Sequence, residues 1–106
     1  MSMSTIGVPL EGFGVYCRAA AAEVAVLLKN EGHMFPLKKE EMVSVFGRCQ
    51  FETYRSGTGS GGAVNVPYAV NIYDGMRESG SFTLNEELAD IYRAWLKDHP
   101  FDNGGG

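Results

Sequence analysis

A glycine-rich run, Ser56-Gly57-Thr58-Gly59-Ser60-Gly61-Gly62, constrains this chain more than any other feature. Glycine loses more backbone freedom on folding than any other residue, so such a run is costly inside a helix or strand and suits a surface loop. The run lies between two segments with alternating apolar residues, 48–55 and 64–73, and helical patterns precede and follow them. We therefore expect a helical beginning, a central hairpin and a helical end.

Size and composition indicate one small globular domain over residues 1–106, with an irregular lead-in over 1–12 and a flexible tail over 103–106. The 106 residues are 44% hydrophobic and 21% charged, which is ordinary for a folded domain of this length. No apolar run is long enough to span a bilayer, and the first residues do not resemble an export signal. With only two cysteines, the sequence favours reduced thiols and a cytoplasmic location, without a membrane.

Three segments have helical patterns. Apolar residues recur at steps of three and four over 13–31, and Gly32 follows as the expected stop. Residues 38–46 favour a short helix closed by Gly47. Residues 83–98 begin with a predicted capping box between Thr83 and Glu86 and continue with an apolar stripe.

Two segments alternate as strands do. In 48–55, Cys49, Phe51 and Thr53 fall on the inner face, and 64–73 alternates in the same way, with residues 80–82 as a short third strand. The predicted fold is α+β: a long N-terminal helix, a short second helix, a two- or three-stranded antiparallel sheet, and a C-terminal helix packed on the sheet. The predicted core consists of Tyr16, Val24, Leu27, Leu28, Phe46, Phe51, Val66, Val70, Ile72, Leu88, Ile91, Tyr92 and Trp95.

No motif predicts a catalytic, cofactor or metal site. The glycine run lacks the Gly-Lys-Ser/Thr ending of a phosphate-binding loop, and the expected hairpin leaves no strand-helix-strand crossover for a dinucleotide site. The two cysteines and two histidines, Cys17, Cys49, His33 and His99, have no zinc-ligand spacing. Adjacent carboxylates such as Glu86 and Glu87 point to different sides of a helix, so they do not form an acid/base pair.

A protein-binding surface is the favoured functional site. Tyrosine and arginine are enriched at binding hot spots, and the outer face of the predicted hairpin carries several of them. The predicted partner-binding residues are Arg48, Tyr54, Arg55, Gly59, Asn71 and Tyr73.

The favoured function is a non-catalytic protein-binding regulator, adaptor or inhibitor, since small acidic regulators from phages and mobile elements share these traits and the net charge is −4. The first alternative is a nucleic acid binder. Residues 40–47 resemble the first helix and turn glycine of a winged-helix domain, with 48–55 as its recognition helix and the glycine run as its wing. The second alternative is a small enzyme that uses a thiol or a histidine. A monomer and a homodimer are both compatible with the sequence.

Overall fold

The computed structural model describes residues 8–55 and 66–101. The glycine run, and with it Gly59, lies outside the described residues, as do residues 64 and 65 of the second predicted strand and the predicted tail over 103–106. The chain divides into two compact units, residues 1–35 and 36–106, and each is described by itself. The predicted single domain over 1–106 stays a prediction. No helix within the described ranges is long and apolar enough to cross a membrane.

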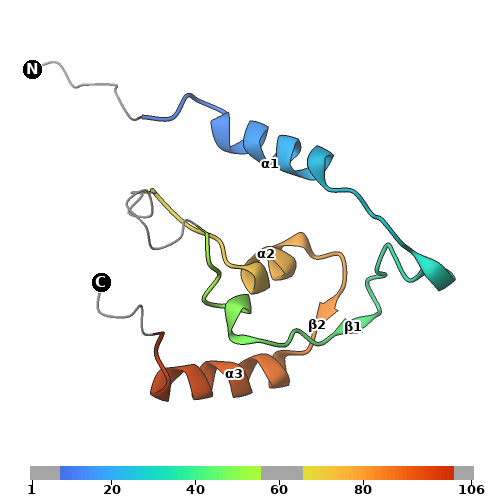
Figure 1. Ribbon diagram of the computed structural model, residues 1–106, viewed down its shortest axis with the longest axis vertical. Helices are drawn as coiled ribbons and strands as arrows, with labels where there is room; N and C mark the ends of the chain where they lie inside the picture. The colour runs from blue at the N-terminus through green and yellow to red at the C-terminus, as the bar shows by residue number, and fades with distance from the viewer. Residues whose placement is uncertain (1–7, 56–65, 102–106) are drawn as a thin grey trace, which may run out of the picture. The chain divides into compact units, whose positions relative to one another are not determined.

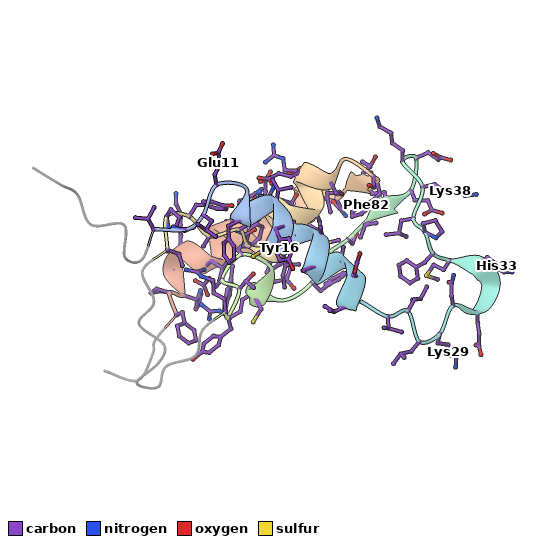
Figure 2. All side chains as sticks on the ribbon, turned by 90° about the horizontal axis from the view of Figure 1, so that it is seen from above. Glu11, Tyr16, Lys29, His33, Lys38 and Phe82 are labelled. Carbon is purple, nitrogen blue, oxygen red and sulfur yellow. The ribbon has the colours of Figure 1, made fainter. Side chains whose placement is uncertain are left out.

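The first unit contains the helix α1, Phe13–Val24, and a short 3₁₀ turn, η1, Glu31–His33. The predicted helix over 13–31 is too long, because the backbone becomes extended at Ala25, where the β-branched Val24 and Val26 flank it. Figure 2 shows Tyr16 on α1 and Lys29 and His33 on the segment and turn that follow.

Asn30 holds the turn in place. Its Nδ2 donates to the carbonyl oxygen of Phe35 at 2.8 Å, and its Oδ1 accepts from the backbone N–H of Phe35 at 3.0 Å. Gly32, expected to end the helix, lies inside this turn with a φ of 73°, a left-handed conformation that favours glycine.

The second unit is built around two short parallel strands, β1, Met42–Val43, and β2, Thr83–Leu84, which Figure 1 shows side by side. Met42 pairs with Thr83 and Val43 with Leu84. Parallel neighbours require a crossover connection. Here the crossover contains a 3₁₀ helix, η2, Arg48–Gln50, and the helix α2, Ile72–Ser79, and the helix α3, Glu86–Asp98, follows β2.

This arrangement overturns four sequence-based expectations. Residues 42–43 are strand, where a helix over 38–46 was expected. Residues 48–55 contain η2 instead of a strand, and the second predicted strand gives way to α2 at Ile72. The strands of the described ranges form a parallel pair, so the predicted antiparallel hairpin is wrong and the crossover that it excluded is present. Tertiary packing determines the secondary structure of these segments. Alternation of apolar residues over a short segment predicts a strand only weakly, so packing with the rest of the chain overrides it.

The predicted C-terminal helix is confirmed in its extent to Asp98, but its start is different. Thr83 belongs to β2, and its Oγ1 donates to the carbonyl oxygen of Lys39 at 2.9 Å, so it forms no capping box. Asn85 is the cap instead: its Oδ1 accepts from the N–H of Leu88 at 3.1 Å, and its backbone N–H donates to Val43 at 2.8 Å. One residue therefore ends the sheet and begins the helix.

The core of the second unit is small and differs from the predicted one. Its buried apolar residues are Tyr73, Leu84 and Ala89, and Phe51 is the member of the predicted core that packs against them. Most of the others are exposed, because the faces that carry them have no covering layer in the described residues. The exposed members of the predicted core are Tyr16, Val24, Leu27, Leu28, Phe46, Val66, Val70, Ile72, Ile91 and Trp95.

Candidate functional site

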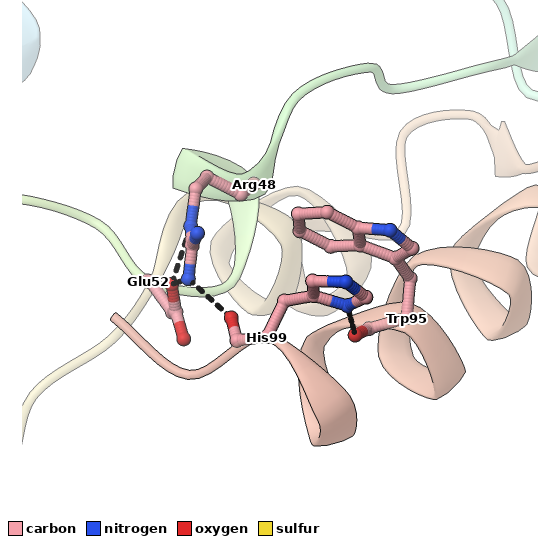
Figure 3. Close-up of polar contacts among 4 residues, drawn as sticks. All are labelled: Arg48, Glu52, Trp95 and His99. Carbon is pink, nitrogen blue, oxygen red and sulfur yellow. Dashed lines mark hydrogen bonds and ion pairs between the residues drawn. The ribbon is translucent and has the colours of Figure 1, made fainter. Parts of the chain in front are cut away.

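Arg48 joins the start of η2 to the C-terminal end of α3 (Figure 3). Its Nε and Nη2 donate to Oε2 of Glu52 at 2.8 and 2.6 Å, and Nη2 also donates to the carbonyl oxygen of His99 at 2.9 Å. The last carbonyls of a helix lack partners within it, so this contact satisfies one of them. Both side chains of the pair are about one-third exposed, at 32% and 33%.

Aromatic rings surround this ion pair. His99 stacks on Trp95 with ring centroids 4.0 Å apart and planes within 5° of parallel, and its Nδ1 lies 2.8 Å from the carbonyl oxygen of Trp95. The guanidinium carbon of Arg48 lies 5.7 Å from the Trp95 ring centroid and 5.8 Å from that of Phe101. Tyr54 meets Phe101 edge to face at 6.1 Å. Cation–π and aromatic contacts thus hold these side chains in one surface.

A cavity of about 430 Å³ opens beside this surface, lined by Arg48, Ile91, Tyr92 and Trp95. We call it the Trp95 cavity. Its position depends on the bend at Gly47, which has a φ of 97° and whose N–H donates to the hydroxyl of Tyr92 at 3.0 Å. The bend carries the chain from β1 into η2, and the hydrogen bond fixes η2 against α3.

A second polar cluster surrounds Arg93 on α3. Its Nη1 donates to Asp90 at 2.9 Å and lies 3.7 Å from a carboxylate oxygen of Glu86. Its guanidinium carbon lies 4.9 and 5.0 Å from the ring centroids of Phe51 and Tyr73. Because both carboxylates contact one cation and are exposed, the cluster is typical of an ion-pair network rather than an acid/base pair.

Tyr73 is the largest fully buried side chain, with 1% of its surface exposed, and its hydroxyl has no hydrogen-bond partner among the described residues. Burial, with a smaller contribution from the Glu86 carboxylate, raises the pKa of the Tyr73 phenol above its ordinary value. The expectation that Tyr73 faces a partner is therefore wrong. The residue lies in the first turn of α2 and points into the core instead of standing on a strand.

The other predicted partner-binding residues have different positions. Arg48 and Tyr54 both contact the ring of Phe101, so they lie in the surface around the Arg48–Glu52 pair. Arg55 is exposed. Asn71 caps α2, since its Oδ1 accepts from the N–H of Asp74 at 2.7 Å. Whether any of them binds a partner stays a prediction.

Glu52, His99 and Phe101 belong to this surface although no sequence pattern predicted it, and Trp95 lies in it instead of in the predicted core. The signal for two of them was present in the spacing. Trp95 and His99 are four residues apart at the end of a helix, and Arg48 and Glu52 are four residues apart, so each pair meets on one face of a helical turn.

No metal site is formed by the described residues, since no group of three or more His, Cys, Asp or Glu side chains comes together there. Cys17 and Cys49 are both free and exposed, so the prediction that Cys49 lies on the inner face of a strand is wrong.

Residues 25–97 match the glycosyl hydrolase family 3 C-terminal domain. A beta-glucosidase of Ruminococcus albus is 48% identical over 85 residues, which cover 80% of this chain and 9% of that protein. Beta-glucosidase A of Butyrivibrio fibrisolvens is 34% identical over 74% of this chain and 10% of its own. The crystal structure of a beta-glucosidase from Paenibacillus barengoltzii has a TM-score of 0.85 and 64% identity over 94% of this chain and 11% of that one. The chain thus spans about a tenth of the length of these relatives.

These similarities overturn the expectation of a non-catalytic regulator, adaptor or inhibitor, because the matching proteins are β-glucosidases and the matching family is a glycosyl hydrolase domain. The winged-helix and thiol- or histidine-enzyme alternatives are wrong for the same reason, and β1 also lies where the first helix of a winged-helix motif was required. The absence of a recognisable set of reacting groups in 106 residues does not indicate a protein without catalysis.

Proposed function

Because the chain belongs to the glycosyl hydrolase family 3 C-terminal domain family, we propose that it works as part of a β-glucosidase, an enzyme that hydrolyses β-linked glucosides. The observation that carries the proposal is the 64% identity to the Paenibacillus barengoltzii enzyme over 94% of this chain. Identity at this level, with a TM-score of 0.85, supports a shared role as well as a shared fold.

In this proposal the chain supplies structure and binding surface rather than the two reacting carboxyl groups. Glycoside hydrolysis generally needs two carboxyl groups that flank the scissile bond, one of them with a raised pKa. The carboxylates of Glu86 and Asp90 are exposed and contact Arg93, and Glu52 is bound to Arg48. We therefore assign the reacting pair to residues outside the described part of this chain.

The protein partner expected from the sequence becomes, in this proposal, the remaining part of a β-glucosidase. Parallel strands are normally covered on both faces. Met42 of β1 and Phe46, four residues further along, are nevertheless 68% and 72% exposed, while Val43 and Val45 pack against the core. The uncovered apolar residues suit a permanent protein interface. A cytoplasmic location stays part of the proposal, supported by two free cysteines.

A segment exchange tests the proposal. The region of the Paenibacillus barengoltzii enzyme that matches this chain is replaced by residues 1–106, and hydrolysis of p-nitrophenyl β-D-glucoside is measured. We expect kcat/KM within about tenfold of the parent, a difference of about 1.4 kcal/mol in activation free energy.

The matched control is the same exchange with Tyr73→Ala, which removes the largest buried side chain and should abolish soluble enzyme. A soluble exchange enzyme with the parent's thermal transition and without hydrolysis would contradict the proposed function.

A further inference from the structure

We propose that the Trp95 cavity is a docking site for apolar side chains from the remaining part of the β-glucosidase to which this chain contributes. The inference rests on the proposed function, since that function supplies the partner. It adds a second contact surface, on α3, to the uncovered Met42 and Phe46, and it states the chemistry of the groups that fill the cavity.

The lining of the cavity presents only apolar surface to its interior. The polar groups of its side chains have partners elsewhere. The Tyr92 hydroxyl accepts from the N–H of Gly47 at 3.0 Å. Nη2 of Arg48 donates to Glu52 at 2.6 Å and to the carbonyl oxygen of His99 at 2.9 Å, and the Glu52 carboxylate balances its charge. Since burying an unpaired polar or charged group is costly, the cavity favours a neutral, apolar occupant.

The apolar walls of the cavity are rigid but uncovered. Ile91 is 61% exposed and Trp95 is 47% exposed. His99 stacks on the indole of Trp95 at 4.0 Å, which fixes the ring without burying it (Figure 3). Single exposed apolar residues are common on protein surfaces, but here two large ones line one concave site. A fixed aromatic ring in an apolar pocket is typical of the centre of a protein interface.

Two observations favour a polypeptide of the same enzyme over a small ligand. Small-molecule sites combine apolar walls with a few placed polar groups, and this lining exposes none. The cavity also adjoins a face without a cover, because Phe46, which is 72% exposed, directly precedes the Gly47 that is bound to Tyr92. The chain spans 9% and 11% of two of its relatives, so a β-glucosidase has ample further chain to cover both surfaces. Permanent interfaces of this kind are the most apolar ones.

Thiol labelling compares the cavity in the isolated chain and in the exchange enzyme. Ile91→Cys places a thiol in the lining, and Ala94→Cys, the matched control, places one at an exposed position of α3 outside it. Each protein is treated with iodoacetamide, and modification of the substituted position is followed by peptide mass spectrometry. At position 91 we expect labelling at least about tenfold slower in the exchange enzyme, because a covered thiol reacts only when the interface opens. Labelling at position 94 should be similar in both proteins.

A second pair of variants tests whether the occupant is apolar. Ile91→Leu keeps an apolar side chain, and Ile91→Glu places a carboxylate there. In the isolated chain both should leave the thermal transition nearly unchanged, because the position is 61% exposed. In the exchange enzyme Ile91→Glu should shorten the half-life of activity near the thermal transition at least about tenfold relative to Ile91→Leu, since it leaves an unpaired charge in an apolar interface. Should the Ile91→Glu enzyme not fold, the labelling of Ile91→Cys still decides the question.

The outcomes separate the two proposals. Three results would overturn the docking site and leave the β-glucosidase role standing in an active exchange enzyme: labelling at position 91 as fast as in the isolated chain, equal protection at position 94, or equal half-lives of Ile91→Glu and Ile91→Leu. Protection of the isolated chain that grows with its concentration would assign the cavity to a second copy and overturn the proposal as well. A folded but inactive exchange enzyme with protection at position 91 alone would refute the β-glucosidase role and retain the docking site.

Discussion

Replacing Tyr73 tests the account of the core, because two substitutions at this position should have opposite effects. Tyr73→Phe removes only a buried hydroxyl that has no partner in the described residues. An unsatisfied buried polar group costs about 1–3 kcal/mol, so we expect the free energy of unfolding to be unchanged or to rise by about 1 kcal/mol. Tyr73→Ala removes the whole ring.

The magnitude for alanine follows from the contacts of the ring. Truncating a buried aromatic side chain costs about 3–5 kcal/mol through lost burial and the cavity left behind. The contacts with Phe51 at 4.9 Å and Arg93 at 5.0 Å are lost as well. Since small domains have only about 5–15 kcal/mol of stability and only three apolar residues are buried in the described part of this unit, the alanine variant should be largely unfolded.

Urea unfolding of the isolated chain at pH 7, followed by far-ultraviolet circular dichroism, measures both effects. Equal slopes against urea for the wild type and Tyr73→Phe would show that the two unfold between similar states. A loss of more than about 1 kcal/mol in Tyr73→Phe would refute the reasoning, since it would mean that the hydroxyl makes a net favourable hydrogen bond.

Three further predictions concern other parts of the second unit and its response to pH. Trp95→Ala should lower the free energy of unfolding by about 1–2 kcal/mol, less than for a buried aromatic residue, because the indole is 47% exposed. Urea unfolding of both variants should show that Trp95→Ala loses less stability than Tyr73→Ala. Asn85→Ala should cost about 1–2 kcal/mol by removing the cap of α3 and the contact with Ser44 at 3.0 Å, whereas Asn85→Asp keeps the cap and should cost less in the same assay. Burial, and then Glu86, raise the pKa of Tyr73, so the unfolded chain ionises first as pH rises. Stability that is complete below about pH 10 should therefore be lost above it, and a pH series of unfolding curves should show a shallower loss for Tyr73→Phe.

The sequence predicted the elements whose signals are local. The C-terminal helix was found because its apolar stripe runs through Leu88, Ile91 and Trp95 and because Pro100 follows its end at Asp98. Its start was misplaced since Thr83 and Asn85 are both good caps, and the choice between them depends on strand pairing with Met42 and Val43. The pairing of two segments about forty residues apart cannot be predicted from the spacing of residues within either segment.

The surface around Arg48 likewise has some members that local sequence patterns predict and others that depend on tertiary packing. Arg48 and Tyr54 were chosen for the chemistry of their side chains, and both reach the surface that contains the Trp95 cavity. Trp95 was assigned to the core because large aromatic residues are usually buried, which holds only where a covering layer exists. The alternating pattern predicted Cys49 and Phe51 on one face of a strand. In a 3₁₀ helix followed by an irregular segment they separate, so that Cys49 is exposed and Phe51 packs on Tyr73.

The exposed positions that contradict the predicted core also bear on the proposed function, because they leave one face of the sheet uncovered in the described residues. Two parallel strands of two residues each form few hydrogen bonds, and such a pair is stable only when helices and further strands cover it. Val43 and Val45 face a small core, whereas Met42 and Phe46 alternate with them and stay exposed. A protein that ended its packing at this sheet would gain nothing from apolar residues on the outer face. Under the proposed function, the exposed Met42 and Phe46 would pack against the remaining part of a β-glucosidase, which would give the sheet its second covered face.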